Sequence, residues 1–266
     1  MGKSYLFKRK VLLGITGGIS SYKSIFLVRL LKKLGAEVQV ILTPNAKRFV
    51  SPLVLSVLSK RKVFSDFFSD SENPDWNNHI DLALWADLII IAPTTANTIS
   101  KLSTGACDNL LLSVVLSRRC PIILSPAMDH DMFLNEITSI NIEKLKKNNF
   151  LFIDGDSGEL ASGLVGFGRM AEPEKIINYL ESFFKDLSPL KNINCLVTGG
   201  PTYEKIDPVR FIGNFSSGKM GCAIANELAF LGANVELVLG PSSSEIHPNV
   251  SVHRVESTKE MYDACL

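Results

Sequence analysis

The sequence predicts an α/β protein built on a doubly wound parallel sheet, and three observations predict it. Short apolar runs of strand length alternate with longer segments whose apolar residues recur at helical spacing. The apolar runs are nearly continuous, which is typical of parallel strands covered on both faces. A glycine turn, Gly17–Gly18, follows the first run and recurs as Gly199–Gly200. We therefore expect a Rossmann or flavodoxin-like sheet, followed by the beginning of a second Rossmann-like α/β domain.

The elements of the first domain are expected in chain order. Each strand is a run of branched aliphatic residues, such as DLIIIA at 87–92, and the first helix ends at Gly35, a typical C-terminal cap. The polar stretch 64–78 is expected as a loop, and the glycine-rich stretch 157–170 as a structureless loop. Strands are expected at 11–15, 37–43, 87–92, 121–125 and 150–154, and helices at 22–34, 46–58 with an interruption near Pro52, 79–85, 98–116, 141–148 and 173–185.

A second domain begins after a linker. Residues 185–192 are rich in polar residues and proline, so we divide the chain into domains 1–187 and 188–266. Strands at 194–198 and 234–239 enclose a helix at 222–231, and another helix begins after Ser257. A doubly wound domain usually has about 100–150 residues. We therefore expect this second domain to be incomplete.

Composition excludes several classes of protein. With 266 residues and a net charge of +1, the chain has no bulk charge that would attract nucleic acid. No apolar run is long enough to cross a membrane, and the first residues lack the pattern of a secretory signal. The five cysteines form no C-x-x-C pair, which favours reduced thiols in a cytoplasm over disulfides or a metal site.

The glycine turn is the first candidate site. Gly17 and Gly18 lack the Cβ atoms that would keep a ligand from the backbone, and Ser20 and Ser21 are suitable N-cap residues for the next helix. A helix N-terminus of this kind attracts anions, most often phosphate. The third glycine of a dinucleotide fingerprint is missing. An ordinary turn into a crossover helix is therefore an equally open interpretation.

Three further clusters follow strands, where ligands of this fold class bind. Residues 93–98 present short polar side chains that suit either a flavin and its ribityl chain or a simple helix cap. Residues 126–132 form the second cluster. Residues 157–170 form the third, which is either a mobile flap over a site or a surface loop. His79 is the best candidate general base, although a structural hydrogen bond is the commoner role of a lone histidine. His130 is a weaker rival.

Five motifs in this order carry a family resemblance over roughly the first 185 residues. They are GITGGISSYK at 14–23, WNNHIDL at 76–82, APTTANT at 92–98, PAMDHDM at 126–132, and LASG at 160–163 with GRM at 168–170. The chain resembles the bifunctional coenzyme A biosynthesis proteins, in which a flavin-dependent phosphopantothenoylcysteine decarboxylase is fused to a phosphopantothenate–cysteine ligase. Residues 198–210 and 214–221 are similar to the start of the ligase, whose later segments are not found in this chain.

The resemblance implies a set of site residues. Catalytic roles fall on His79, Asp129 and Ser162, and substrate binding on Met128, Asp129, Met132 and Arg169. FMN binding falls on Gly17, Gly18, Ser20, Ser21, Thr43, Thr95, Ala96, Asn97 and Thr98. Asn214 and Lys219 fall in the ligase region, whose reaction would use CTP and Mg²⁺. The resemblance also implies trimers that assemble into dodecamers, with FMN at a subunit interface, and no nucleic-acid or membrane partner.

The implied reaction converts 4′-phosphopantothenoylcysteine to 4′-phosphopantetheine. The cysteine end is oxidised to a thioaldehyde that accepts the electrons released with carbon dioxide, His79 takes a proton, and the resulting enethiol is reduced. Two positions depart from the family pattern: Asp129 replaces an asparagine and Ser162 a cysteine proton donor. Our hypothesis is that a protonated Asp129 binds the substrate carboxylate, and that Asp129 or a water held by Ser162 gives the final proton. Alternatives are release of the enethiol and a flavin-binding regulatory subunit.

Overall fold

The computed structural model describes residues 4–68, 76–155, 157–159, 163 and 165–266, in two compact units. Leu6–Leu180 form the larger unit, and Glu181–Leu266 form the smaller unit together with Ser4 and Tyr5. The carboxylate of Glu181 accepts hydrogen bonds from the Ser4 hydroxyl and, at 2.9 Å, from the backbone N–H of Tyr5. These bonds attach the start of the chain to the smaller unit.

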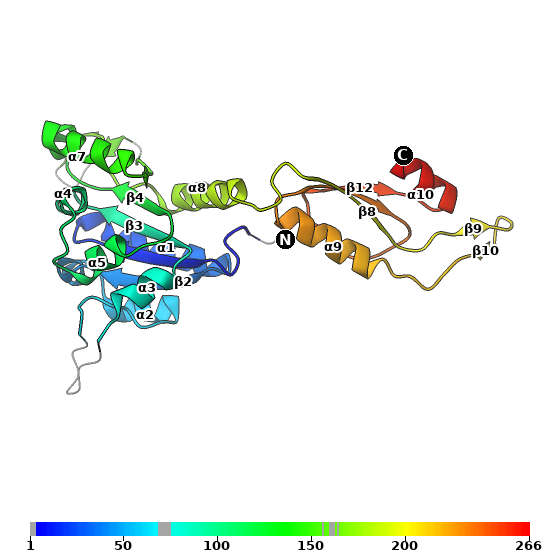
Figure 1. Ribbon diagram of the computed structural model, residues 1–266, viewed down its shortest axis with the longest axis horizontal. Helices are drawn as coiled ribbons and strands as arrows, with labels where there is room; N and C mark the ends of the chain where they lie inside the picture. Colours follow the sequence, from blue (N-terminus) through cyan, green and yellow to red (C-terminus); the bar gives the residue numbers. More distant parts are fainter. Residues whose placement is uncertain (1–3, 69–75, 156, 160–162, 164) are drawn as a thin grey trace. The chain divides into compact units, whose positions relative to one another are not determined.

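A five-stranded parallel sheet in the order β2-β1-β3-β4-β5 forms the centre of the larger unit (Figure 1). Its strands are β1 (Lys10–Ile15), β2 (Glu37–Leu42), β3 (Leu88–Thr94), β4 (Ile122–Pro126) and β5 (Phe150–Phe152). All neighbours pair in parallel. The strand order reverses direction between β1 and β3, which is the flavodoxin-like arrangement. The predicted fold class is therefore confirmed.

Helices bury both faces of this sheet, so every residue of β3 and β4 is buried. The helices α1 and α2 lie side by side, as do α3 and α5, and α4 and α7 (Figure 1). Their bounds are α1 (Lys23–Lys33), α2 (Pro52–Ser59), α3 (His79–Trp85), α4 (Ala96–Thr104), α5 (Leu110–Leu116), α6 (His130–Leu134), α7 (Glu136–Lys147) and α8 (Pro173–Asp186). One face of the core joins Leu12, Ile89 and Ile122 of the sheet to residues of α3, α4, α5 and α7.

The single helix predicted over 98–116 is wrong, because α4 and α5 are separate. Gly105 ends α4 in the left-handed conformation, with a φ of 73°. The Asn109 side chain then caps α5 by accepting from the backbone N–H of Leu112 at 3.1 Å. The helix predicted at 141–148 begins earlier, at Glu136, where the Asn135 side chain caps it. The short α6 before it was not predicted.

The predicted N-cap role of Ser20 and Ser21 is also wrong. A short 3₁₀ helix, η1 (Ile19–Tyr22), precedes α1, so the cap positions fall on Gly18 and Tyr22, and neither makes a side-chain cap bond. The Ser21 hydroxyl donates instead to the carbonyl oxygen of Thr16 at 2.7 Å. A second 3₁₀ helix, η2 (Pro44–Arg48), replaces the first part of the helix predicted at 46–58. The rest is α2, which begins at Pro52, where the interruption was expected.

The stretch 157–170 is not structureless, because it contains a short antiparallel hairpin. The two strands are β6 (Gly158–Glu159) and β7 (Val165–Gly166), and Gly158 pairs with Gly166. An isolated antiparallel bridge between Asp154 and Met170 lies beyond the hairpin ends. The residues on either side of the hairpin, Asp154 and Met170, therefore lie next to each other just after β5.

The smaller unit has a parallel sheet in the order β12-β11-β8, which confirms that a second parallel sheet begins. Strands β8 (Asn194–Gly199), β11 (Asn234–Leu239) and β12 (Val250–Arg254) enclose a core with α9 (Lys219–Phe230). The hairpin of β9 (Glu204–Lys205) and β10 (Phe211–Ile212), like β12, was not predicted. The last helix, α10 (Thr258–Cys265), follows Ser257 as expected. Among the described residues no helix is long and apolar enough to span a membrane.

Candidate functional site

A cavity of about 590 Å³ lies where β1, β2, β3 and β4 end. Three of the predicted clusters contribute to its wall: Gly17 after β1, residues 95–98 after β3, and Met128 and Met132 after β4. This placement follows from the fold, because the carboxyl ends of parallel strands share one edge of the sheet. The remaining lining residues are Thr43, Pro44, Asn45, Lys101, Asp108, Asn109 and Ala127.

Thr16, which was not among the predicted site residues, connects the end of β1 to β3 at the edge of the cavity. Its hydroxyl donates to the carbonyl oxygen of Pro93 at 2.8 Å and accepts from the backbone N–H of Thr95 at 3.1 Å. Thr16 is buried, so these two bonds are shielded from water. A hydroxyl residue directly before a glycine turn was the available sequence signal. The bonds hold the start of the 95–98 segment against the first turn.

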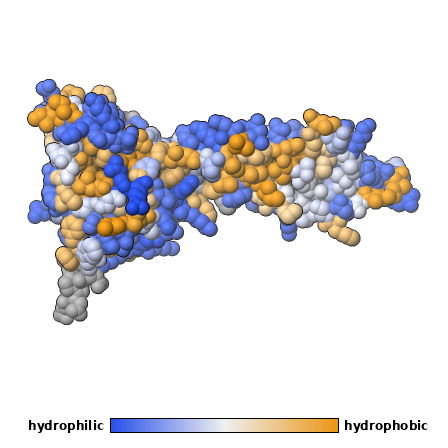
Figure 2. Space-filling view, viewed as in Figure 1, coloured by the Kyte–Doolittle hydropathy of each residue, from blue (hydrophilic) through white to orange (hydrophobic). Residues whose placement is uncertain are grey.

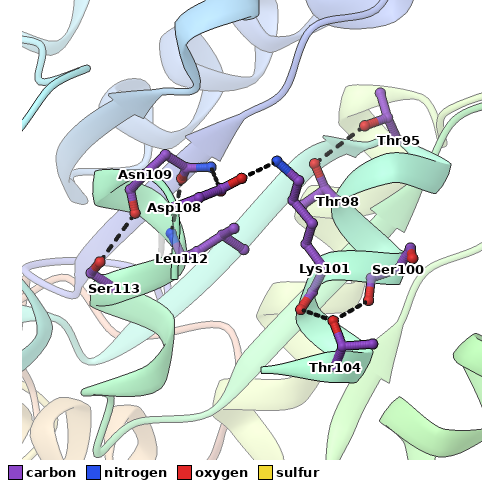
Figure 3. A network of polar contacts seen from close by, with 9 residues as sticks. All are labelled: Thr95, Thr98, Ser100, Lys101, Thr104, Asp108, Asn109, Leu112 and Ser113. Carbon is purple, nitrogen blue, oxygen red and sulfur yellow. Dashed lines mark hydrogen bonds and ion pairs between the residues drawn. The ribbon is translucent and has the colours of Figure 1, made fainter. Parts of the chain in front are cut away.

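Polar side chains of α4 face those of Asp108 and Asn109, which directly precede α5, as Figure 3 shows. The hydroxyls of Thr95 and Thr98 lie 3.2 Å apart. The ammonium group of Lys101 forms an ion pair with the Asp108 carboxylate. Lys101 lowers the pKa of Asp108 below its usual value, because it hydrogen-bonds to the carboxylate and carries the opposite charge. The wall therefore presents hydroxyls and a neutralised ion pair.

The two glycines of the first turn differ in their surroundings. A Cβ atom on Gly17 would lie 2.9 Å from the Cβ of Asn45, closer than real Cβ contacts allow. A Cβ atom on Gly18 would lie 3.5 Å from the Thr95 side chain, an ordinary contact. Gly17 lines the cavity and Gly18, Ser20 and Ser21 do not. The turn after β1 therefore approaches the turn after β2 so closely that glycine is required at position 17 but not at position 18.

The segment 126–132 contributes methionines to the cavity but not its carboxylate. Met128 and Met132 are lining residues, whereas Asp129 is not. Asp129 occupies the N-cap position of α6 and makes no side-chain cap bond there. The guanidinium of Arg169 lies 3.5 Å from the Glu172 carboxylate, which also accepts from the buried Lys23 at 2.7 Å. Ser162 lies outside the described residues.

His79 lies apart from the cavity lining of its own chain. It is the first residue of α3, and its ring packs edge-on against Phe67 and Trp76, with centroids 6.4 Å and 6.2 Å away. Its Nδ1 atom is buried and has no hydrogen-bond partner within the described part of the chain. The structural hydrogen bond that was the alternative role for His79 is therefore not formed by Nδ1 there.

Both candidate residues of the smaller unit are exposed, Asn214 in a loop and Lys219 at the start of a helix. The Asn214 side chain accepts from the backbone N–H of Ser216 at 2.9 Å, and Lys219 is the first residue of α9. A Cβ atom on Gly240 would lie 1.8 Å from the carbonyl oxygen of Pro201, so the turns after β8 and β11 are in close contact. In the ranges that the structure describes, no group of three or more His, Cys, Asp or Glu residues could hold a metal ion.

The cavity suits a polar ligand with an anionic end. Its volume falls within the roughly 300–1,000 Å³ that small-molecule sites occupy. The N-terminus of α4 lies at the cavity. Because the Thr95 side chain does not cap the helix, it does not occupy the backbone N–H groups of the first turn, which can therefore bind an anion. Amides and hydroxyls of residues 95–98 add donors and acceptors. These features fit a flavin mononucleotide, which combines a phosphate, a polyol chain and a planar ring.

Two family models together match nearly the whole chain. Residues 3–185 match the model described as Flavoprotein, and residues 190–266 match the model described as DNA/pantothenate metabolism flavoprotein C-terminal domain. The coenzyme A biosynthesis bifunctional protein CoaBC of Vibrio vulnificus is 46% identical over 258 residues. That alignment covers 97% of this chain and 64% of the relative. The chain thus spans less than two thirds of that relative's length.

Solved structures resemble the larger unit. A mutant PPC decarboxylase complexed with pantothenoylaminoethenethiol is 31% identical with a TM-score of 0.59, and the match covers 67% of this chain and 99% of that one. The FMN binding protein AtHal3 is 29% identical with a TM-score of 0.57, over 67% of this chain and 98% of its own.

Proposed function

This chain belongs to the Flavoprotein family, and from that membership we propose that it catalyses FMN-dependent decarboxylation of 4′-phosphopantothenoylcysteine to 4′-phosphopantetheine in coenzyme A biosynthesis. The observation that carries the proposal is the cavity at the strand ends, which gathers three of the motifs expected for this family on one surface. Similarity over 97% of the chain to a coenzyme A biosynthesis protein supports the substrate class.

Within this proposal, FMN binds in the cavity. Gly17 and residues 95–98 hold it through backbone and short polar side chains, and Thr43 adds a hydroxyl on the β2 side. Gly18, Ser20 and Ser21 act indirectly, because they shape the turn from outside the cavity lining. When bound, FMN supplies the oxidation and reduction that the cysteine end of the substrate requires.

We infer that His79 serves a cavity in a neighbouring copy of this chain. It is the proposed base, yet the cavity of its own chain does not include it, and its buried Nδ1 has no partner in the described residues. Large apolar side chains nearby are exposed, among them Ile80 at 47% and Leu84 at 52% on α3. Apolar surface is also visible on the face of the larger unit that Figure 2 draws. Self-association, as trimers and larger assemblies of trimers, would bury such surface.

Asp129, Met128, Met132 and Arg169 are proposed to receive the acidic substrate. The methionines form the apolar part of the cavity wall. The Arg169 guanidinium is a suitable partner for a carboxylate or phosphate. Asp129, or a water held by Ser162, is proposed to deliver the final proton. If that delivery fails, the enethiol is the product.

The smaller unit is proposed to contribute a different chemistry. We infer that Asn214 and Lys219 belong to a CTP- and Mg²⁺-dependent ligase region, in which Asn214 would serve the acyl–nucleotide step. The support is that Lys219 begins α9 directly after Gly218, where a Cβ atom would lie 3.3 Å from Cα of Gly200 in the turn after β8. The ligase reaction is assigned to this region by resemblance only. We place the decarboxylation in the cytoplasm, which the scattered cysteines, all free in the structure, favour.

One experiment tests the proposal. The purified chain is reconstituted with FMN, and carbon dioxide release from 4′-phosphopantothenoylcysteine is measured together with the product mass. We expect a flavin absorbance spectrum, release of carbon dioxide and 4′-phosphopantetheine. A chain that binds FMN without releasing carbon dioxide would support the regulatory alternative. Carbon dioxide release with the enethiol as the only product would support the oxidative one.

A further inference from the structure

Phe167 and Gly168, which directly follow β7, touch the turn that carries Asp129 at two points. The backbone N–H of Met128 donates to the carbonyl oxygen of Gly168 at 2.9 Å. The Nδ1 atom of His130 lies 3.2 Å from the backbone nitrogen of Phe167 and 3.3 Å from its carbonyl oxygen. A neutral ring can accept from the Phe167 N–H through Nδ1. The side-chain bond of His130 to Phe167 thus lies next to the backbone bond of Met128 to Gly168.

Glycine residues permit this approach. A Cβ atom on Gly166 would lie 2.4 Å from Nδ1 of His130 and 2.7 Å from Cγ of the same ring. Gly166 is not among the glycines with positive φ, so its backbone does not itself require glycine. A Cβ atom on Gly168 would lie 2.3 Å from the carbonyl oxygen of Met128. Glycine is therefore needed at position 166 because a side chain there would collide with the ring of His130.

The contact links groups that belong to the proposed substrate site. On one side, Met128 lines the cavity and Asp129 follows it. On the other side, Arg169 follows Gly168, and its Nη1 atom would lie 2.6 Å from a Cβ on Gly158 of β6. The guanidinium therefore lies over the hairpin. Holding residues 166–168 on the turn after β4 therefore fixes Arg169 relative to Asp129.

We propose that His130 is a positioning residue, whose ring holds residues 166–168 against the Asp129 turn and thereby sets the distance between Asp129 and Arg169. The identity of the acidic substrate that these two groups receive rests on the proposed function. The contact itself does not rest on it. His130 needs no bond to the substrate in this role, because it acts through the backbone of Phe167.

The first test compares His130→Phe, which keeps a ring without nitrogen, with His130→Asn, whose amide oxygen can accept from the Phe167 N–H. Hydrogen exchange of the Phe167 amide, the affinity for FMN, kcat and KM are measured on the FMN-loaded full chain. We expect His130→Phe to speed that exchange and lower kcat/KM by about fivefold, as loss of one hydrogen bond predicts, with unchanged FMN affinity. His130→Asn should restore both readouts.

A matched control is His247→Phe. His247 makes the same kind of bond in the smaller unit, accepting from the backbone N–H of Asn249 at 3.2 Å. Its substitution should change neither the Phe167 exchange nor decarboxylation. If His130→Phe and His247→Phe have equal effects, the proposed role of His130 is wrong.

A second test uses Gly166→Ala in the native chain and in a His130→Ala background. The added methyl group should disturb the native chain, because it meets the ring, and should have no further effect once the ring is gone. An equal effect in both backgrounds, or unchanged exchange of Phe167 in His130→Phe, overturns the inference. A chain with no decarboxylase activity would refute the proposed function, whereas the exchange data would still decide the role of His130.

Discussion

Thr16 and Pro93 are joined across the sheet by a hydrogen bond of 2.8 Å from the threonine hydroxyl to the proline carbonyl oxygen. The bond ties the end of β1 to β3 at the edge of the cavity, and the same hydroxyl accepts from Thr95. Because Thr16 is buried, water cannot replace these two hydrogen bonds when the hydroxyl is removed.

We therefore expect Thr16→Val, which preserves the shape of the side chain, to lower the free energy of unfolding by about 1–3 kcal/mol, since a buried carbonyl and a backbone N–H lose their partner. Urea denaturation of the apoprotein measures this change. Thr104→Val is the control, because its exposed hydroxyl bonds only to carbonyls of its own helix. Equal stability of the two variants would refute the structural role of Thr16.

The two turn glycines should differ in their tolerance of alanine. Gly17→Ala places a methyl group against Asn45 in the cavity wall, and we expect FMN affinity to fall by about tenfold, in line with the roughly 1–3 kcal/mol that overpacking costs. Gly18→Ala meets only an ordinary contact and should bind FMN nearly as the native chain does. Fluorescence titration with FMN measures both, and the opposite order would contradict the placement of FMN against Gly17.

His79→Asn should keep FMN and lose activity. We expect kcat to fall by about 10²–10⁴-fold, the usual loss when a general base is removed. FMN should still bind, because Gly17 and residues 95–98, which are proposed to hold it, are unchanged in this variant. Spectra of the purified variant and its carbon dioxide release measure the two properties.

A mixing experiment tests whether the site is shared between copies. Ala96→Trp fills the cavity, so this variant should be inactive while its His79 remains intact. Refolding His79→Asn together with Ala96→Trp should restore part of the activity, because one chain supplies the cavity and the other the base. Absence of recovery would mean that base and cavity act within one chain.

Asp129→Asn should slow the last step of the proposed reaction. Loss of the acid should lower formation of 4′-phosphopantetheine by about tenfold or more, with the enethiol accumulating. Mass spectrometry of timed reactions measures both products. Asp131→Asn, two residues further on and exposed, is the control. Unchanged turnover in Asp129→Asn would refute our assignment of proton delivery to Asp129.

The five strands of the larger unit's sheet were predicted well because buried parallel strands leave a nearly continuous apolar pattern, whereas β12, in which apolar and polar residues alternate, was missed. β3 occupies Leu88–Thr94 where 87–92 was expected. Helix boundaries inside crossovers were harder, since the apolar spacing continues across Gly105 although its left-handed backbone ends α4. The hairpin of β6 and β7 was missed because glycine-rich sequence hides the pairing of Gly158 with Gly166. The strand propensity of single residues does not indicate which residues pair across a hairpin.

The cavity could be anticipated only in part. The rule that ligands bind at strand ends placed residues 93–98 and 126–132 at the expected site, and residues 95–98 and Met128 both line the cavity. The bonds of Thr16, the pairing of Lys101 with Asp108, and the proximity of Asn45 to Gly17 depend on side-chain packing between distant segments. The position of His79 outside the cavity lining has the same origin. The roles assigned to these residues stay predictions.

The cavity wall extends along the chain from Gly17 to Met132, so it needs four strands in place before it exists. Parallel strands pair through long crossovers and are slow to assemble. A nascent chain therefore offers no surface to the flavin until most of the larger unit has been synthesised. The vitamin-derived ligand would then act late, as a stabiliser of the finished sheet by mass action rather than as a template for it. Riboflavin supply would accordingly govern the lifetime of the folded enzyme more than its rate of folding.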